Sequence, residues 1–430
     1  MNSSKNYRKE VDIQSRWKWL SFIDWLLPAY VVCSLPTFYL GQHLDFVFKG
    51  LAIITTLFYI IRFRMPKGPT AKLFTAFVLL VVFSFFQYLY NDRAIELYIS
   101  DASNYIAAML FFYVGVTDDR PERPFYTKLV YAIAIIFALG LMCYVTMPGW
   151  FLSRTVEAIN AGNAVQYDET NVFEQMRFGA FWGDSYSVSH LSVFCVAIAI
   201  FDVGYSEDKK KIIALVCLVI GLLSSIASMH RASMAGSGLA LTAYFYFNHV
   251  TGRKKDNVYL IMAGVALIIG FFAIMPNLTD RVEDIIALIT NRVDDNMSLD
   301  TALKERKYTD QVMASMRFFF FGHGLGAGGV GARAYGFPGI SDMQYIKMFF
   351  ENGILGAFLF IAIIIRVLRR GIKNIRYYLT EVVIIVFILV AMLGSNSLSI
   401  YYLIVYPFWY AIGRISNNEY FYRVKTKAWI

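Results

Sequence analysis

Long uninterrupted apolar runs are the feature of this sequence that most constrains its fold. The runs are about 18 to 23 residues long, the length at which an α-helix crosses the roughly 30 Å hydrocarbon core of a bilayer. Of the 430 residues, 57% are hydrophobic and only 17% are charged, a balance that a soluble domain does not have. The chain is therefore predicted to be an all-α polytopic membrane protein, with residues 1–430 forming a single integral membrane domain.

The polar breaks between the apolar runs predict the topology. Reading the runs against these breaks gives about twelve candidate spans. Breaks rich in Lys and Arg, including residues 62–72 and 366–376, fall on one side together with both termini, and this bias predicts that the side is cytoplasmic. The net charge of +9 follows from these topology signals, so nucleic-acid binding is not expected. The candidate spans are residues 19–40, 45–62, 73–91, 100–117, 128–147, 187–204, 212–229, 232–250, 258–275, 344–365, 380–396 and 398–413.

Two breaks on the outer side are much longer than a connection requires. Residues 148–186 are predicted to form a first periplasmic loop, and residues 276–343 a large, partly helical one. Helical spacing of apolar residues occurs within the large loop at 281–293 and again at 298–316. The glycine-rich residues 322–339 lack the Gly-Lys-Ser/Thr ending of a phosphate-binding loop. We expect them to form a flexible loop that closes over substrate.

Charged residues that could carry chemistry collect on the predicted outer side. Arg177, Arg231 and Arg306 are candidates for binding a lipid-linked pyrophosphate, because guanidinium groups stay ionised and bind phosphate oxygens through paired hydrogen bonds. Asp342 is a candidate for accepting the proton of an acceptor hydroxyl. No His, Cys and Asp cluster has metal-ligand spacing, so a metal-free mechanism without a cofactor is expected.

Each candidate also has a structural explanation. Arg231 falls between two spans, where an arginine often snorkels to the interface. Arg177 opens a span and is compatible with the same explanation. Arg306 has Asp310 one turn further on as a partner for a surface ion pair. Asp342 precedes a span and suits a helix N-cap.

Lys347 and Glu351 stand four residues apart inside a predicted span. This spacing places their side chains on one face of a helix, where opposite charges neutralise one another. We expect an ion pair between them.

Four stretches, in order along the chain, resemble the superfamily of O-antigen polymerases (Wzy) and O-antigen ligases (WaaL). They are RFGAFWGDSYSVSH (177–190), MHRASMAG (229–236), ERKYTDQVMASMRFFFFGHGLGAGG (305–329) and DMQYIKMFFENGILG (342–356). The last stretch is similar to the element with Tyr, then Glu-x-Gly, that begins the span after the large loop in that superfamily.

The resemblance implies metal-independent, inverting glycan transfer from an undecaprenyl-pyrophosphate donor by a helical membrane enzyme of the GT-C type. Arg231 and Arg306 match arginines that engage the donor pyrophosphate, and Arg177 matches a third. Asp342 stands where the ligases place a histidine, which favours a polymerase. Further candidates for substrate binding are His230, Arg317, His323 and Tyr345.

The expected function is polymerisation of lipid-linked oligosaccharide repeats at the periplasmic face of a bacterial inner membrane. Expected partners are the lipid-linked donor and acceptor and membrane lipids, with a chain-length regulator and a flippase as further candidates. A ligase that transfers glycan to lipid A core is the first alternative. A transporter is the second, although transporters usually place polar sites near the bilayer midplane in repeated halves, a pattern that this sequence lacks.

Overall fold

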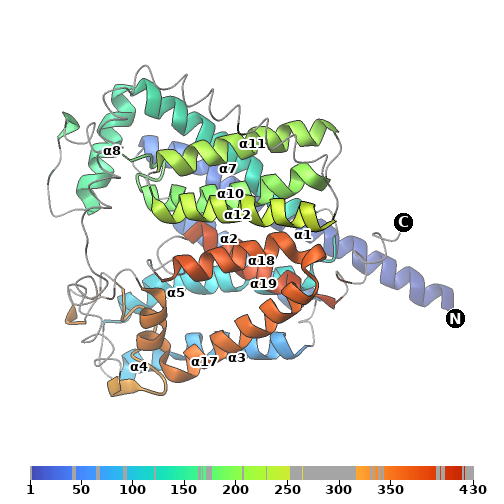
Figure 1. The fold of residues 1–430 in the computed structure, drawn as a ribbon. Coiled ribbons are helices and arrows are strands. Elements are labelled where there is room, and N and C mark those ends of the chain that lie inside the picture. Colours follow the sequence, from blue (N-terminus) through green and yellow to red (C-terminus); the bar gives the residue numbers. More distant parts are fainter. Residues whose placement is uncertain are drawn as a thin grey trace. The chain divides into compact units, whose positions relative to one another are not determined.

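The computed structural model, drawn in Figure 1, describes the greater part of the chain. The described residues are 2–40, 45–63, 68–90, 94–120, 123–162, 166, 168–170, 177–205, 208–228, 230–251, 264, 316–329, 332, 335–337, 340, 343–393, 398, 402–418 and 421. Apart from turns and connecting segments these residues form helices, and no strand occurs among them. The predicted all-α class is therefore confirmed for the described part of the chain.

Several helices have the length and apolar composition of membrane spans. Helices overlap every predicted span except 258–275, of which only Gly264 is described. The helices predicted at 281–293 and 298–316 also lie outside the described residues, apart from Met316. On length and composition, the chain is an α-helical multi-pass membrane protein. Within the described part of the chain, six segments qualify as spans: Gln14–Leu40, Pro69–Tyr90, Ile95–Thr117, Pro124–Thr146, Lys210–Ala227 and Gln344–Lys373.

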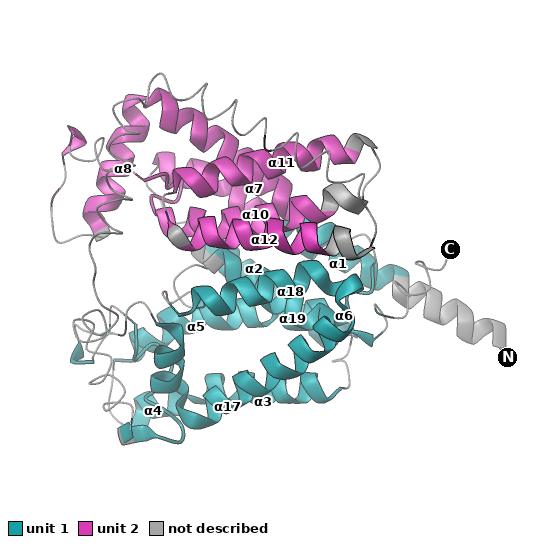
Figure 2. Cartoon of the chain, viewed as in Figure 1, with its two compact units in different colours: residues 1–27, 45–126, 303–430 teal, residues 28–44, 127–302 magenta. Residues whose placement is uncertain are grey.

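The chain folds into two compact units, coloured separately in Figure 2. Unit 1 comprises Met1–Leu27, Asp45–Tyr126 and Leu303–Ile430. Unit 2 comprises Pro28–Leu44 and Thr127–Ala302. The long first helix α1 (Asn2–Leu40) contributes residues to both units.

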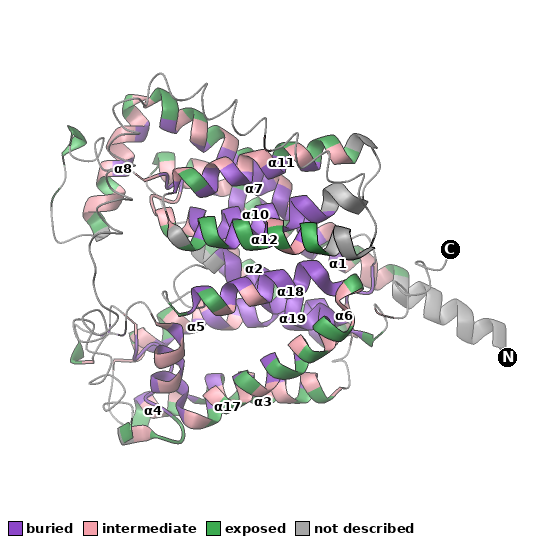
Figure 3. Cartoon of the chain, in the orientation of Figure 1, coloured by how far each residue is buried: buried purple, intermediate pink, exposed green. Residues whose placement is uncertain are grey.

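Unit 1 is built around its last helix, α19. Residues 403–415 of α19 are all buried, as the purple colour in Figure 3 shows. Its backbone approaches α6 so closely that a Cβ atom at Gly413 would lie 2.2 Å from the carbonyl oxygen of Phe112. Small residues permit this kind of close helix contact in membrane proteins. The helices of unit 1, besides α1, are α2 (Asp45–Phe63), α3 (Pro69–Phe83), α4 (Phe85–Tyr90), α5 (Ile95–Met109), α6 (Phe111–Thr117), η3 (Met316–Phe318), α17 (Gln344–Lys373), α18 (Ile375–Ala391) and α19 (Tyr402–Ser416).

Unit 2 packs two antiparallel helices on a third. Helix α10 (Ser185–Tyr205) contacts both α11 (Asp208–Ala227) and α12 (Arg231–Thr251), and its residues 188–201 are buried. A helix that is apolar on all faces belongs in the interior of such a bundle. Most of α7 (Pro124–Thr146) belongs to this unit as well.

The first predicted outer loop contains a helix, α8 (Gly149–Gly162). Aromatic rings attach this helix to the rest of unit 2: the ring of Phe151 lies 5.7 Å from that of Phe38 and 6.0 Å from that of Phe181. Aromatic pairs at this separation stabilise a fold by about 0.5 to 1.5 kcal/mol beyond their area burial.

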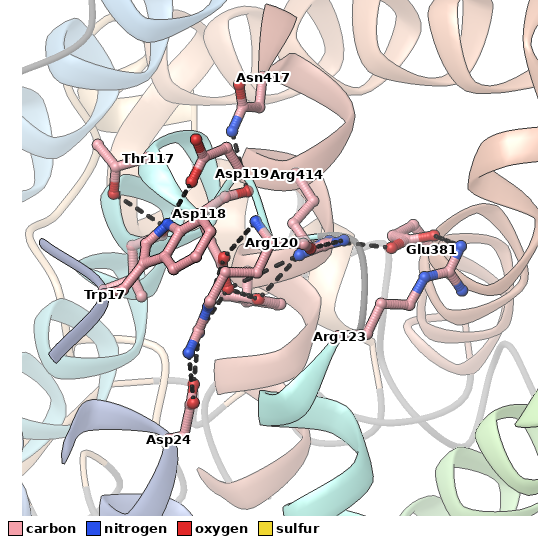
Figure 4. Close-up of polar contacts among 12 residues, drawn as sticks. Trp17, Asp24, Thr117, Asp118, Asp119, Arg120, Arg123, Glu381, Arg414 and Asn417 are labelled. Atoms are coloured by element: carbon pink, nitrogen blue, oxygen red, sulfur yellow. Dashed lines mark hydrogen bonds and ion pairs between the residues drawn. The ribbon is translucent and has the colours of Figure 1, made fainter. Parts of the chain in front are cut away.

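Arg120 neutralises two buried carboxylates in unit 1, between the end of α6 and the start of α7 (Figure 4). Its Nη1 and Nη2 atoms donate to the two carboxylate oxygens of Asp24 at 2.8 and 2.9 Å. Nε and Nη2 donate to the two oxygens of Asp118 at 2.9 and 2.8 Å. The guanidinium therefore connects α1 to the α6–α7 connection through two bidentate contacts.

Arg414 extends the same network to α18 and α19. Its Nε atom donates to Oε1 of Glu381 at 3.2 Å, and its Nη1 atom lies 3.7 Å from Asp118. The side-chain amide of Asn417 donates to the main-chain carbonyl of Asp118 at 2.9 Å. We call Asp24, Asp118, Arg120, Glu381 and Arg414 the ionic network. All five residues are buried, and together they join α1, the α6–α7 connection, α18 and α19.

Replacing Arg120 by methionine should destabilise unit 1 by about 3 to 5 kcal/mol, because two carboxylates remain buried beside one cation too few. Denaturant titration of the purified full-length protein in detergent, followed by tryptophan fluorescence, measures this change. Arg154→Gln is the control, since Arg154 pairs with the exposed Glu157 and should cost less than about 1 kcal/mol. Equal effects of the two substitutions would contradict the assigned role of Arg120.

The stability of unit 1 should also fall at acid pH through Asp118. Burial by itself raises the pKa of Asp118, but the hydrogen bonds and charge of Arg120 and the charge of Arg414 lower this pKa below its ordinary value. An unfolded aspartate has a pKa of about 3.9, so ionised Asp118 stabilises the fold above about pH 4 and loses this effect as the pH falls further. The difference in unfolding free energy between wild type and Asp118→Asn should shrink below pH 4. A difference that stays constant from pH 7 to pH 3 would refute this.

Candidate functional site

Two of the four stretches that the sequence analysis singled out meet in unit 2. The main-chain N–H of Phe178 donates to the carbonyl of Ala227, at the end of α11, at 3.1 Å. Oγ of Ser185 lies 2.9 Å from Nε2 of His230, and the rings of Tyr186 and His230 are 4.1 Å apart. Residues 177–190 and the α11–α12 turn therefore form one contact region.

Buried serines hold the α11–α12 turn in a fixed conformation. Ser233 donates to the carbonyls of His230 and Ser225, at 2.7 and 3.2 Å. Ser237 donates to the hydroxyl of Ser225 at 3.1 Å, and the hydroxyls of Ser228 and Ser233 lie 3.2 Å apart. We call residues 225–237 the serine hairpin. Its hydroxyls bond one another and the main chain, so the turn between the helices does not depend on solvent for its hydrogen bonds.

The serine hairpin contains two predicted site residues, His230 and Arg231, at the start of α12. Arg231 is the first residue of that helix, and its side chain lies outside what the structure describes. His230 and Arg177 are both half-buried. The amino-terminal end of a helix carries a partial positive charge, which adds to that of a nearby cation in favouring an anion. The start of α12 therefore contributes a partial positive charge at this end of unit 2, while the adjoining segment contributes the carboxylate of Asp184, which accepts hydrogen bonds from the N–H groups of Tyr186 and Ser187.

The other two stretches meet in unit 1, where α17 is broken. Gly353 has a φ of +62° inside α17, and a Cβ atom there would lie 2.4 Å from the carbonyl oxygen of Phe320. At this break the N–H of Ile354 donates to the carbonyl of Phe319 at 2.8 Å. The N–H groups of His323 and Gly324 donate to the carbonyls of Phe350 and Glu351 at 2.8 and 2.9 Å. Only glycine fits the break, because the incoming segment occupies the space of a side chain.

The side chain of Glu351 holds the glycine-rich segment through two further bonds. Its Oε1 atom accepts the main-chain N–H groups of Gly326 and Gly328, each at 3.0 Å. We call residues 322–329 the glycine loop. The Glu-x-Gly element and the glycine-rich stretch of the sequence are thus packed together: Glu351 accepts hydrogen bonds from the glycine loop, and the absence of a side chain at Gly353 allows the close backbone contact.

Lys347 joins two carboxylates beside the glycine loop. Its Nζ atom lies 3.4 Å from Oε1 of Glu351, so the predicted ion pair is confirmed, and 2.8 Å from Oδ2 of Asp101 on α5. We call Asp101, Lys347 and Glu351 the lysine cluster. Lys347 and Glu351 are each only 1% exposed, whereas the side chain of Asp101 is 19% exposed. Asp101 is therefore the carboxylate of the cluster that solvent or a ligand reaches.

The glycine loop is packed rather than free to move, which corrects the prediction of a flexible loop for residues 322–328. All of these residues are buried. Tyr88 donates its hydroxyl hydrogen to the carbonyl of Leu325 at 2.7 Å, and the N–H of Leu325 donates to the hydroxyl of Ser84 at 3.1 Å. The high glycine content suggested flexibility, but these glycines instead allow positive φ angles and close contact between backbone segments.

His323, predicted to contact substrate, is covered by aromatic rings. Its ring stacks on that of Phe350 at 4.2 Å and meets the edge of Phe318 at 4.6 Å. Tyr345 donates its hydroxyl hydrogen to the carbonyl of Leu389 on α18 at 2.8 Å. Both side chains are thus placed by contacts within unit 1, and their contact with substrate stays a prediction.

Some buried polar atoms near the lysine cluster have no hydrogen-bond partner among the described residues. They include both side-chain polar atoms of Asn352 and the hydroxyl of Tyr105. Tyr105 is close enough to Asp101 and Glu351 for their charges to act on it. Buried polar groups are normally paired, so such a group marks a place where water or a hydroxyl-bearing ligand would be stabilised.

Main-chain hydrogen bonds hold Ile340 and Gln344, two residues before and after Asp342, which itself lies outside the described residues. The N–H of Ile340 donates to the carbonyl of Gly328 in the glycine loop at 2.9 Å. The N–H of Gln344 donates to the carbonyl of Met392 at 3.1 Å. Met343 occupies the N-cap position of α17, so the alternative explanation of Asp342 as that N-cap is wrong.

The remaining predicted positions are only partly described. Arg306 lies outside the described residues, and so does its suggested partner Asp310. Arg317 belongs to the short helix η3, and its side chain lies outside the description. The gathering of Arg177, Arg231 and Arg306 around one diphosphate therefore stays a prediction.

Asp101 is the member of the site that sequence reasoning missed. The signal was present, since an ionisable residue inside a predicted span is a default candidate for function. Its partner could not be inferred, because Asp101 and Lys347 are separated by 246 positions in sequence.

No protein-family model and no curated protein sequence matches this chain.

Replacing Gly326 by alanine should displace the glycine loop. The new Cβ atom would lie 2.3 Å from the carbonyl oxygen of Leu97, at a φ of +90°. We expect a loss of unfolding free energy of about 2 to 5 kcal/mol from overpacking and backbone strain together. Gly336→Ala is the matched control, because Gly336 has a φ of +79° but no atom within 4 Å of a new Cβ, and should cost about 1 to 2 kcal/mol. Similar losses in denaturant titrations of both variants would argue against tight loop packing.

Proposed function

We propose that this chain is a glycosyltransferase that polymerises surface polysaccharide. It joins oligosaccharide repeats carried on undecaprenyl pyrophosphate, at the periplasmic face of a bacterial inner membrane. The reaction inverts the anomeric centre and needs no metal ion. We further propose about twelve spans and a GT-C-like arrangement, from the apolar runs and the resemblance together.

The observation that carries this proposal is the meeting of residues 177–190 with the serine hairpin in unit 2. These two stretches resemble donor-binding elements of the polymerase and ligase superfamily, and most of α10 and α11 separates them in sequence. Their contact places His230, the start of α12 and the segment of Arg177 together, at the predicted outer end of two spans. A departing diphosphate needs positive charge in such a position, where charge develops during transfer.

The glycine loop and the lysine cluster support the second half of the reaction. Removal of a proton from the acceptor hydroxyl requires a base in a fixed position. In this proposal Asp342 is that base, and the glycine loop positions it by binding Ile340. Glu351 and Lys347 act through the loop, as positioning residues.

Two other functions are compatible with an α-helical membrane protein. A ligase would use the same donor and transfer finished glycan to lipid A core, but Asp342 replaces the histidine of the ligases. A transporter would place charge near the bilayer midplane. Lys347 and Glu351 are the observation in favour of a transporter, because they are buried inside a span. Glu351 accepts hydrogen bonds from two main-chain N–H groups. This arrangement favours a structural role for its charge over a role in binding and releasing a transported ion or substrate.

Arg231→Gln should reduce polymerisation by 10²-fold or more, because removal of one preorganised charge at a developing oxyanion has about this effect. The measurement is chain length and amount of surface glycan in a strain that lacks the gene and carries each variant on a plasmid. Arg376→Gln, at an exposed arginine of the opposite predicted side, is the control and should behave as wild type. Arg231→Lys should also fail if paired hydrogen bonds to phosphate are required.

The glycan that accumulates distinguishes the three functions. Lipid-linked single repeats outside the membrane support the polymerase. Full-length glycan stranded on its lipid carrier supports the ligase, and single repeats trapped on the cytoplasmic face support the transporter. Unchanged glycan in the Arg231→Gln strain would rule out the proposed role of the serine hairpin.

A further inference from the structure

A large cavity lies in unit 1 at the Lys- and Arg-rich ends of its helices. Its volume is about 1140 Å³, and it is lined by α17, by the start of α3 and by the end of α19. Helices α3 and α17 pack side by side, and Nε of Arg366 donates to Oγ1 of Thr70 across their contact at 3.1 Å (Figure 1). The volume is sufficient for a ligand of at least drug size.

The cavity wall carries strong positive charge. Arg366, Arg369, Arg370 and Lys373 line it from α17, and the described lining residues include no aspartate or glutamate. Arg370 donates only to neutral groups, among them the carbonyl of Asn417 at 3.0 Å. Within the described residues, none of the four forms an ion pair with a carboxylate. Their charges therefore remain available to an anionic ligand.

One face of α17 supplies both the cations and an apolar wall. Each lining residue of this helix lies three or four positions from another lining residue, which places them along one side of the helix as a stripe. The stripe is apolar from Phe358 to Ile365 and basic from Arg366 to Lys373, and each part is about 10 Å long at 1.5 Å per residue. Phe358, Ile361 and Ile365 are 65%, 51% and 46% exposed. A molecule bound along this stripe must be apolar at one end and anionic at the other.

We propose that this cavity, lined by the stripe of α17, is a binding site for an anionic phospholipid. The phosphate group binds Arg366, Arg369 and Lys373, and an acyl chain lies along Phe358, Ile361 and Ile365. The charge bias of the chain predicts that this end faces the cytoplasm, where the leaflet is anionic and basic pockets between helices bind lipid head groups. This site is independent of the proposed glycosyltransferase activity, which belongs to the opposite predicted side.

Lipid titration of the delipidated full-length protein, followed by native mass spectrometry, tests the proposal. The probes are phosphatidylglycerol and phosphatidylcholine with identical acyl chains. One phosphatidylglycerol should bind in preference to phosphatidylcholine. The triple variant Arg366→Gln, Arg369→Gln, Lys373→Gln should weaken this binding about 10²-fold, since each such cation contributes about a factor of five to ten. Equal binding of the two lipids to wild type would overturn the proposal.

Two further variants separate a defined site from general surface charge. The triple variant Arg62→Gln, Lys210→Gln, Arg376→Gln removes three exposed cations that do not line the cavity, and should change phosphatidylglycerol binding less than threefold. Ala362→Trp fills the apolar part of the cavity and leaves all Lys and Arg residues, which set the membrane topology, unchanged. This variant should weaken phosphatidylglycerol binding at least tenfold. A control variant that loses as much affinity as the cavity variant, or an Ala362→Trp protein that binds as wild type, would refute the site.

Inorganic phosphate distinguishes a lipid from a free phosphate group. Up to about 10 mM phosphate should displace phosphatidylglycerol less than twofold, because phosphate alone lacks the apolar contacts that burial of an acyl chain supplies. Displacement below 1 mM would assign the site to a soluble phosphate compound and overturn the lipid proposal.

Discussion

The pairing of Arg120 with Asp24 and Asp118 is the interaction on which the helical framework of unit 1 depends. A charge taken out of water costs several kcal/mol unless opposite charges and hydrogen bonds surround it. Arg120 meets this condition through two bidentate contacts, and Arg414 adds a second cation beside Asp118. Because these residues come from different helices, their charges are paired only when the helices are assembled. The network therefore specifies one arrangement of α1, α6, α18 and α19, in addition to any contribution to stability.

The same requirement organises the opposite end of unit 1 around Glu351. Its carboxylate is buried inside a candidate span, where it needs Lys347 and two glycine N–H groups. These N–H groups belong to the glycine loop, and the segment before this loop packs against α17 at the break, where Gly353 has no side chain. The buried charge of Glu351 therefore depends on the loop, and the position of the loop depends on the break at Gly353. In the proposed reaction this arrangement fixes the residues that flank Asp342.

The sequence predicted some of these features because they are local. The ion pair between Lys347 and Glu351 follows from helical spacing alone, and it is present. The flexible glycine loop was predicted from composition, and for residues 322–328 this was wrong, because the contacts with Ser84, Tyr88 and Glu351 are distant in sequence. Asp101 was missed for the same reason. The sequence predicted that the segments of Arg177 and Arg231 lie on the same side of the membrane, but it gave no indication that Ser185 contacts His230.

By itself, the sequence determined that this chain is helical and crosses a membrane several times, because the length and composition of an apolar run decide its transfer into lipid one segment at a time. It also placed the candidate cations at the ends of spans, through the positions of polar breaks. Only the tertiary structure decided which charges neutralise one another, where α17 breaks, and which face of α17 lines a cavity. Those outcomes depend on pairs of residues up to about 300 positions apart, such as Asp118 and Tyr410, and no local pattern encodes such a pairing.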